Sequence, residues 1–590
     1  MPTARTQSAR RRTAKAPPRA ASVIDAKPVA LEPARSTLDD ALAYQAELWR
    51  RSVLFLDTLR VRANNMLAHE QAGSPPLLDF DYETLLDARR FEHPANYALL
   101  RITGSREHRA EECERPDARP VIIIDPRAGH GPGIGGFKRE SEVGMALHEG
   151  HPTYFVVFYP EPCPGQTLAD VLHALRRFVN EVGRRHGGRA PTLYGNCQAG
   201  WAIALLAATH DGLLGPAVLN GSPLSYWAGA SDVNPMRLAG GLVGGTWLAH
   251  LIGDLGDGRF DGAWLVQNFE NLNPANTWWE KNYRLFADID GERERFLEFE
   301  RWWTGFYFLS REEMVAIVEN LFIGDRLEQG KLRICEECVA DLTAIHNPLV
   351  IFASSADNIT PPHQALNWVP MVYPTTAALK KAGQRIVYLL NTHVGHLGIF
   401  VSADVAKFEH RAILESLEDI EALRPGLYEM KIDNPTGDPD CRKPQYSVRF
   451  EPRQVEDIRF EYPRATFERA REISEANEAL YKALLGPFVR ASANPAGALL
   501  QKWLHPMRWS RYLYSERLNP WMIPIALLAP SVTGDPRGSA PDNPWMQWEK
   551  LLSRSIARGL EHAGKLRDQL SESEFSLLYS GGGDSARRAP

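Results

Sequence analysis

The stretch 191–206 reads PTLYGNCQAGWAIALL, an apolar strand that passes through a turn of small residues into an apolar helix. A sharp strand-to-helix turn that exposes a nucleophile has the pattern G-x-S-x-G, here with Cys197 in the place of serine. A helix N-terminus stabilises a thiolate, and the backbone N–H of Gln198 would face a developing oxyanion. From this pattern alone, a buried structural cysteine is an equally good interpretation, because Ala199 stands where the pattern has its last glycine.

Two later stretches supply an acid and a base in a matching order. PLVIFASSADNITPP (348–362) places Asp357 just after an apolar strand, and RIVYLLNTHVGHLGIF (385–400) places His393 and His396 after the next. Nucleophile, acid and histidine follow each other in this order, each at a strand end, in the α/β-hydrolase fold. We therefore predict a triad of Cys197, His396 and Asp357, with His393 as the competing base.

Short apolar runs alternate with helical stretches along the chain, which is typical of buried parallel strands covered by helices on both faces. The runs expected to be strands are 97–102, 121–125, 154–159, 192–194, 216–219, 348–353 and 385–390. We predict an α/β protein, an α/β-hydrolase fold with a doubly wound, mostly parallel sheet. An aromatic-rich insert without strand-like rhythm predicts a helical cap, since unstructured loops of that length are rare.

The domain boundaries follow from these changes of pattern. We expect a disordered basic tail (1–36), an N-terminal helical region (37–95), the first part of the core (96–222), the inserted helical cap (223–345), the second part of the core (346–412), a mainly helical C-terminal region containing a short β element (413–570), and a disordered tail (571–590).

Composition excludes several classes of protein. The 590 residues carry 67 basic and 73 acidic side chains, a net charge of −6, which provides no chain-wide field for gripping nucleic acid. Six cysteines are too few for a disulfide framework, and the start has no apolar core of a signal peptide. The longest charge-free apolar run, 238–253, is shorter than the ~20 residues of a spanning helix. We therefore expect a cytoplasmic protein without a transmembrane segment.

The loop after the third strand, DPRAGHGPG (125–133), is expected to provide further backbone donors to the site. Ala128 and Gly129 are the candidates for the second oxyanion donor, beside Gln198. The neighbouring His130 and Gly131 are candidate substrate-binding residues. Two residues next to the predicted acid and base, Asn358 and His393, complete that candidate set.

Two other interpretations of local motifs are weaker. Gly131, Gly133 and Gly136 fit G-x-G-x-x-G, with Glu161 at the end of the next strand, which outlines a dinucleotide site. The proline at 132 stiffens this turn, and an oxyanion loop needs the same glycines. The pair Cys335 and Cys338 lacks a second pair or nearby histidines, so we expect no metal site.

GNCQAGW (195–201), ADNITPP (356–362) and VGHLGIF (394–400) together resemble the polyhydroxyalkanoate synthases, α/β-hydrolase-fold acyltransferases. The cap stretches LNPANTWWEKNYRLF (272–286) and FERWWTGFYFLSREEMVAIVENLFIGDRLEQGKLRI (299–334) resemble that family's cap, and the likeness spans about residues 95–412.

The resemblance implies a 3-hydroxyacyl-coenzyme A substrate and no further cofactor. It implies that Cys197 carries the acyl chain, that His396 activates it, and that Asp357 assists the histidine or an incoming hydroxyl. The sequence departs from the family at Ala199, where the family has glycine, in the glycine-rich loop, and in the helical region after residue 412.

Two further functions stay open at this stage. One is a thioesterase or other hydrolase that uses the same triad with water as acceptor. The other is a non-catalytic protein bound to polyester granules or to a membrane surface through 238–253 and the tryptophan-rich stretches WLHPMRW (503–509) and NPWMIPIALLAP (519–530). The expected partners are a small acyl-CoA, a granule or membrane surface and, as a candidate assembly, a homodimer, with no nucleic acid.

Overall fold

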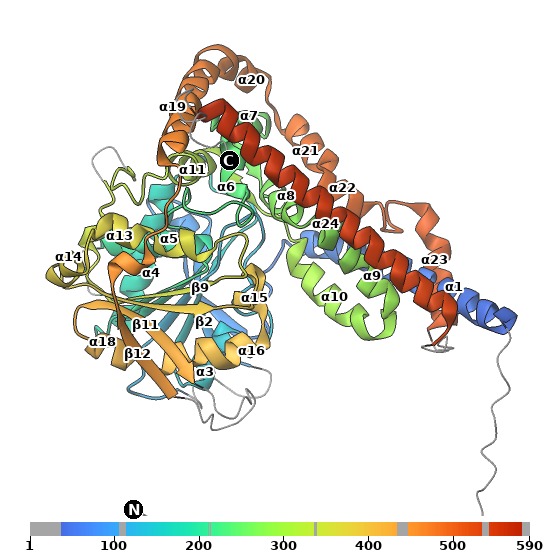
Figure 1. Cartoon of the computed structure of the whole chain (residues 1–590), viewed down its shortest axis with the longest axis horizontal. Coiled ribbons are helices and arrows are strands. Elements are labelled where there is room, and N and C mark those ends of the chain that lie inside the picture. The colour runs from blue at the N-terminus through green and yellow to red at the C-terminus, as the bar shows by residue number, and fades with distance from the viewer. Residues whose placement is uncertain are drawn as a thin grey trace, which may run out of the picture.

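The computed structural model describes residues 37–105, 114–210, 212, 214–334, 339–433, 447–533 and 542–580, and a ten-stranded sheet forms its centre (Figure 1). The order of strands in the sheet is β1-β2-β4-β3-β5-β6-β9-β10-β11-β12. The strands are β1 (Asp81–Asp87), β2 (Tyr97–Gly104), β3 (Val121–Ile124), β4 (Thr153–Phe158), β5 (Thr192–Asn196), β6 (Ala217–Asn220), β9 (Leu349–Ser354), β10 (Arg385–Asn391), β11 (Gly426–Asp433) and β12 (Ser447–Arg453).

The direction of these strands establishes the fold. The pairs β4–β3, β3–β5, β5–β6, β6–β9, β9–β10 and β10–β11 are all parallel. β2 is antiparallel to both of its neighbours, and β12 is antiparallel to β11. A mostly parallel sheet in which β3 and β4 exchange places and β2 runs against the rest is the α/β-hydrolase arrangement, so the predicted fold class is confirmed.

Each central strand is buried on both faces. Its side chains alternate between the two faces, so each strand contributes to two hydrophobic clusters. Ile122 and Ile124 of β3 join one hydrophobic cluster, whereas Val121 and Ile123 join the other. The helices that connect successive strands of this sheet are α3 (Glu142–His148), α4 (Leu168–Arg185), α5 (Gln198–Thr209), α12 (Pro362–Leu366), α13 (Trp368–Val372), α14 (Thr376–Lys381), α15 (His396–Val401), α16 (Ala403–Val405), α17 (Arg411–Glu415) and α18 (Leu417–Ala422).

The cap lies between β6 and β9 and is mainly helical, as expected. Its helices are α6 (Met236–Leu242), α7 (Trp247–Leu255), α8 (Ala263–Leu272), α9 (Lys281–Ala287), α10 (Ile289–Trp303) and α11 (Arg311–Ile317). It also contains the antiparallel pair β7 (Arg259–Asp261) and β8 (Phe308–Ser310), which sequence periodicity did not predict. Strands of three residues are too short to show a period of two.

The N- and C-terminal additions meet in an arm beside the sheet (Figure 1). The N-terminal region expected to be helical consists of α1 (Thr37–Gln71), followed by the edge strand β1. The C-terminal helices are α19 (Arg464–Leu480), α20 (Gly486–Ser492), α21 (Pro495–Leu504), α22 (Pro506–Tyr512), α23 (Ile523–Val532) and α24 (Pro544–Tyr579). The sheet continues past residue 412 into β11 and β12, so the short β element extends the core.

The predicted start of the disordered tail, residue 571, is wrong, because α24 continues to Tyr579. Two aromatic anchors hold its last turns. The Tyr579 hydroxyl donates to the carbonyl of Gly241 at 2.7 Å, and the ring of Phe575 packs against that glycine. Such long-range contacts cannot be recognised in a polar local sequence. The predicted tail 1–36, the last part of the predicted tail 571–590 (residues 581–590), and the pair Cys335 and Cys338 lie outside the described residues.

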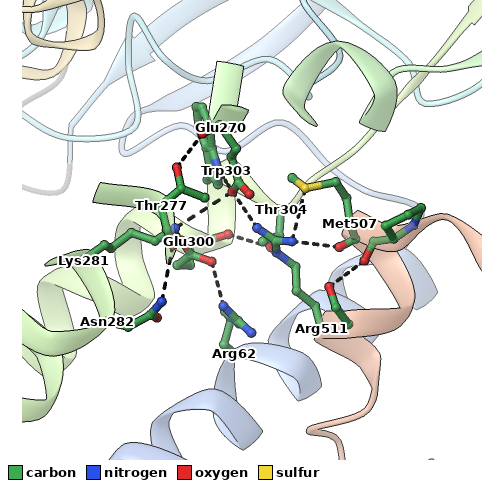
Figure 2. A network of polar contacts seen from close by, with 12 residues as sticks. Arg62, Glu270, Thr277, Lys281, Asn282, Glu300, Trp303, Thr304, Met507 and Arg511 are labelled. Atoms are coloured by element: carbon green, nitrogen blue, oxygen red, sulfur yellow. Dashed lines mark hydrogen bonds and ion pairs between the residues drawn. The ribbon is translucent and has the colours of Figure 1, made fainter. Parts of the chain in front are cut away.

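A buried ionic network ties the arm to the cap (Figure 2). Glu300 of α10 accepts hydrogen bonds from Lys281 at 2.8 Å and from Arg62 of α1 at 3.2 Å. Arg511 of α22 donates to Glu270 of α8 at 2.7 Å. Burial raises the pKa of Glu300, but the charges of Lys281, Arg62 and Arg511 outweigh it and lower the pKa to about 2. Glu300 is therefore the anion on which two added segments and the cap depend.

Within the described part of the chain, no helix has the length and apolar character needed to cross a bilayer.

Replacing Glu300 tests this network. Glu300→Gln leaves Arg62 buried without its counter-charge, and we expect the free energy of unfolding to fall by about 3–5 kcal/mol at pH 7. Because the pKa of Glu300 is lowered in the folded state, its contribution is present above pH 4.5 and is lost as the pH falls towards about 2. Urea unfolding of the two proteins across this pH range measures the difference.

The matched control is Asp433→Asn, which breaks the exposed ion pair between Asp433 and Arg449. This change should cost no more than about 1 kcal/mol. Equal losses in the two variants would contradict the role given to Glu300.

Candidate active site

Cys197 lies in the turn between β5 and α5, with a backbone conformation that side-chain-bearing residues rarely adopt. Its φ is 48° and its ψ is −116°, and α5 begins at the next residue. The Cys197 N–H donates to the carbonyl of Asn220 at 2.8 Å, and its own carbonyl accepts from Gly200 at 3.1 Å. Such strain costs about 1–3 kcal/mol and is found mostly at functional sites.

The turn needs glycine at 195 and 200, and it accommodates alanine at 199. A Cβ atom on Gly200 would lie 1.8 Å from the Ser222 Oγ, and one on Gly195 would lie 2.6 Å from Ile203 Cδ1. The close approach of strand and helix therefore falls on Gly195 and Gly200, while Ala199 is buried in the core. The departure of Ala199 from the motif leaves the elbow intact.

His396 lies at the start of α15 and joins the other two members of the predicted triad. Its Nδ1 is 2.7 Å from the Asp357 Oδ2, and its side chain also makes a hydrogen bond with Cys197. The second carboxylate oxygen of Asp357 accepts from the N–H groups of Ile359 and Thr360, both at 2.8 Å. The structure thus brings together Cys197, His396 and Asp357, whose loops follow three different strands.

The environment of His396 stabilises its protonated form. Burial lowers the pKa of this imidazole, but the charges of Asp357 and Cys197 and the hydrogen bonds to both outweigh burial and raise the pKa from 6.5 to about 10. At neutral pH the arrangement favours an imidazolium beside the sulfur, the pairing that activates a cysteine nucleophile.

The competing base, His393, is placed differently. His393 is exposed, and its backbone N–H donates to the Asn391 side chain at 2.8 Å. Asn358, the other candidate substrate-binding residue of these loops, is exposed as well. Neither lies among the residues that line the cavity above Cys197. His396 is favoured as the base because it is the histidine that bonds to both Asp357 and Cys197.

A cavity of about 240 Å³ opens above Cys197 and Gln198. Its walls come mostly from the cap and are mainly apolar, including residues of α6, α7, α8 and α11. From α8 alone, Trp264, Leu265 and Phe269 face the cavity. An acyl chain of modest length would be sheltered from water here.

The oxyanion candidates divide into two groups. Gln198 lines the cavity beside Cys197 at the N-terminus of α5. Ala128 and Gly129 are outside the lining, and the Gly129 carbonyl accepts from the Tyr307 N–H of the cap at 3.0 Å. Gly129 also has a φ of 100° and packs on Gly262. The structure thus fixes this loop to the cap strands.

His130 and Gly131, predicted as substrate-binding residues, have packing roles instead. The His130 ring lies between Trp302 and Trp303, with centroids 4.6 and 4.5 Å away, and burial lowers its pKa to about 3. Gly131 donates to the Gly305 carbonyl at 2.8 Å. Both residues join the core to the cap, and neither lines the cavity.

The backbone N–H groups of the glycine-rich loop are already hydrogen-bonded within the protein, which argues against the alternative dinucleotide site. The N–H groups of Gly133 and Gly135 donate to the buried Asp125 carboxylate at 2.5 and 3.0 Å, and Gly136 donates to the Gly133 carbonyl at 2.8 Å. A phosphate needs such N–H groups free. Asp125 thus occupies the place of an anion and shapes the loop from inside.

A buried polar network beneath the elbow was missed in the sequence. The Glu142 carboxylate accepts from the amides of Asn196 at 2.5 Å and of Asn220 at 3.3 Å. Burial raises the pKa of Glu142 well above its ordinary value, and burial raises that of nearby Asp125 to about 6. Asn196 precedes the nucleophile and Asn220 accepts its N–H, so this network positions the elbow. In the sequence, this network is indicated only by a polar residue at the end of β5 and of β6, Asn196 and Asn220.

No group of three or more His, Cys, Asp or Glu side chains suited to a metal ion occurs among the residues that the structure describes.

Comparison with known proteins gives one family and several distant structural matches. A family model described as "Protein of unknown function (DUF3141)" matches residues 47–585. An uncharacterized protein in the ackA 5′ region of Rhizobium meliloti is 42% identical over 559 residues, which cover 93% of this chain and 75% of that protein.

Two solved structures illustrate the distant matches. Carboxylesterase CesB (YbfK) from Bacillus subtilis is 13% identical with a TM-score of 0.33, over 60% of this chain and 98% of that one. The monoacylglycerol lipase of Paleococcus ferrophilus is 15% identical with a TM-score of 0.30, over 51% of this chain and 96% of that one. Similarity at this level adds nothing about activity.

The glycine requirement of the elbow can be tested directly. Gly200→Ala forces a methyl group into the Ser222 side chain, so we expect a loss of about 1–3 kcal/mol of unfolding free energy together with a displaced Cys197. Ala199→Gly should cost only about 1 kcal/mol, the ordinary price of glycine in a helix. Denaturant unfolding and the rate of Cys197 alkylation measure both. A larger effect at 199 than at 200 would show that the elbow is built differently.

The imidazolium of His396 beside the Cys197 sulfur predicts selective alkylation of Cys197. At pH 7 iodoacetamide should modify Cys197 at least about tenfold faster than Cys163, the other described free cysteine, whose pKa burial raises. Since the pKa of His396 is raised to about 10, the imidazolium is present below that pH and is lost as the pH rises through it.

Asp357→Asn removes the largest charge that raises this pKa and should slow modification of Cys197 but leave Cys163 unchanged. Peptide mass spectrometry after timed labelling distinguishes the two cysteines. Equal rates at Cys197 and Cys163 in the wild-type protein would argue against an activated nucleophile.

Proposed function

The chain belongs to the DUF3141 family, and we propose that it is an acyl-transferring enzyme that forms an acyl-cysteine on Cys197 from an acyl thioester. The single observation that carries this proposal is the hydrogen-bonded set of Cys197, His396 and Asp357, whose cysteine lines an apolar cavity. A nucleophile, an oriented base and a sheltered space for the acyl group are the parts that acyl transfer requires.

A thioester is the substrate class that suits this site best. A thiolate exchanges readily with a thioester, and the acyl-cysteine formed keeps the reactivity of the original bond. The cavity above Cys197 is lined by Phe260, Met314 and other apolar side chains, which suits an acyl chain rather than a charged group.

In the first half-reaction, the Cys197 sulfur attacks the carbonyl carbon of the thioester. The carbonyl oxygen becomes an oxyanion, which the backbone N–H of Gln198 is placed to stabilise at the start of α5. When the intermediate collapses, the bond from carbon to the leaving sulfur breaks, and the His396 imidazolium gives its proton to the leaving thiolate. Asp357 holds the imidazole in the required tautomer.

In the second half-reaction, neutral His396 takes a proton from an acceptor as the acceptor's oxygen attacks the acyl-cysteine. The bond between carbon and the Cys197 sulfur breaks, and the thiolate–imidazolium pair is restored. The resemblance to polyhydroxyalkanoate synthases favours a hydroxyl acceptor and 3-hydroxyacyl-coenzyme A as substrate, with no separate cofactor. With water as acceptor, the same steps amount to thioester hydrolysis.

Incubation with 3-hydroxybutyryl-coenzyme A tests the proposal. The wild-type protein should release free coenzyme A and gain the mass of one hydroxybutyryl group on the peptide containing Cys197. Cys197→Ala should lower the rate about 10³-fold or more, because the covalent intermediate cannot form. Cys163→Ala is the matched control and should keep the full rate.

Analysis of the products separates the acceptors. Oligomeric esters support transfer to a hydroxyl, whereas free hydroxyacid alone assigns water as the acceptor. Release of coenzyme A at an equal rate by Cys197→Ala and wild type would overturn the proposal.

A further inference from the structure

The C-terminal segment 481–533 exposes an unusual number of large apolar side chains. The exposed set consists of Leu484, Leu485, Phe488, Leu499, Leu500, Trp503, Leu504, Trp509, Leu513, Leu518, Trp521, Ile523, Leu527 and Leu528. Helices α20 to α23, which carry most of them, follow one edge of the molecule beside α24 (Figure 1). Exposed apolar surface of this extent marks an interaction site.

Two of these helices turn their apolar stripe outward. On α21, Leu500 and Leu504 are 59% and 64% exposed, whereas the buried residue is the small Ala498. On α23, Ile523 and Leu527 are 46% and 74% exposed, and the buried residue is again an alanine. A helix that packs on a core buries its i, i+4 apolar side chains. These helices expose them, so the stripe serves something outside the folded chain.

The charge of the segment is opposite to that of the whole chain. Residues 481–533 contain six basic side chains and one acidic side chain, a net of +5 in a protein of net −6. Arg508 and Arg511 are buried and paired with Asp261 and Glu270, so they add no exposed charge.

Lys482, Arg490 and Arg517 are exposed. Lys482 pairs with Glu478, and Arg490 shares the buried Asp254 with Arg311. The one acidic residue, Glu516, is half-buried and bonded to Arg60 at 2.8 Å. Arg490, which shares one carboxylate with a second arginine, and Arg517, which donates to the neutral Gln71, therefore leave positive charge on this surface, and that charge complements an anionic partner.

The helices are too short to enter a bilayer as a spanning segment. α20 and α22 have 7 residues each, and α21 and α23 have 10 each. α20 continues α19 through the π-turn 481–485, whereas α21, α22 and α23 each begin with a proline at the first or second position. Within the described part of the chain none of these helices is long and apolar enough to span a bilayer. Short helices with leucine and tryptophan on one side and lysine and arginine nearby bind in the interfacial region of a membrane.

We propose that α20–α23 form a docking surface for an anionic phospholipid membrane, with Trp521 and Leu527 entering the acyl boundary and Lys482, Arg490 and Arg517 contacting headgroups. Trp521 is the most exposed of these apolar side chains, at 85%. Tryptophan prefers the membrane–water interface, because its ring is apolar and its N–H needs a polar partner. The basic side chains strengthen binding to anionic lipid by an electrostatic attraction that salt weakens.

Vesicle flotation with the full chain tests the proposal. The wild-type protein should float with vesicles of phosphatidylcholine mixed with phosphatidylglycerol, bind vesicles of phosphatidylcholine alone less tightly, and lose affinity as salt rises. The double variant Trp521→Glu, Leu527→Glu should bind at least about tenfold more weakly, because two inserting side chains are replaced by charges that anionic lipid repels. Lys482→Gln with Arg517→Gln should reduce the preference for phosphatidylglycerol.

The matched control is Val339→Glu, the same kind of exchange at an apolar residue that is 45% exposed in the segment returning from the cap to β9. This variant should float like the wild type. Retained release of coenzyme A, or retained thermal unfolding where no activity is found, shows that each variant is folded.

Two outcomes would overturn the proposal. One is wild-type protein that stays unbound with both vesicle compositions. The other is a stable dimer, seen by sedimentation, that Trp521→Glu, Leu527→Glu dissociates while vesicle binding is unaffected, since the surface would then join two copies of this chain.

Discussion

The strained backbone at Cys197 is the constraint on which the site depends. A φ of 48° at a cysteine persists only because β5 and β6 hold the turn between them, through the Asn220 carbonyl, and because Gly195 and Gly200 let strand and helix approach closely. Parallel strands end at one edge of the sheet, so the loops after β9 and β10 bring Asp357 and His396 to the same point. The fold therefore brings together three residues that span 199 positions of the chain.

The triad and the central strands could be predicted because their signals are local. The apolar runs that became β3, β4, β9 and β10 end within a residue or two of their predicted bounds. The sequence favours His396 but keeps His393 as a competing base, because both follow the same strand and only the geometry of the α15 N-terminus separates them. Sequence order identifies a loop, but burial decides which of its side chains faces the nucleophile.

What sequence reasoning missed depends on contacts between distant residues. His130 and the loop around Gly129 follow β3 as the motif requires, but their partners are Trp302, Trp303 and Tyr307 of the cap. The helical end of α24 depends on Gly241, and Glu142 lies under the elbow from a helix between β3 and β4. None of these pairings leaves a periodic pattern, because each involves a single side chain meeting a surface formed by another segment.

Helix α8 lies between two cavities and contacts a different part of the protein on each side. One side carries Trp264 and Phe269 over Cys197, and the other carries Glu270, which Arg511 of α22 holds. That second side borders a separate hollow of about 950 Å³ formed with α1, α9, α22 and α24. The ten-residue α8 therefore separates two cavities. Its outer side is held by α22 through Arg511 and by α24 through Arg567, which donates to the Asn271 carbonyl. The shape of the cavity above Cys197 therefore depends on the C-terminal helices, because the sheet and cap alone would leave one of its walls without these contacts.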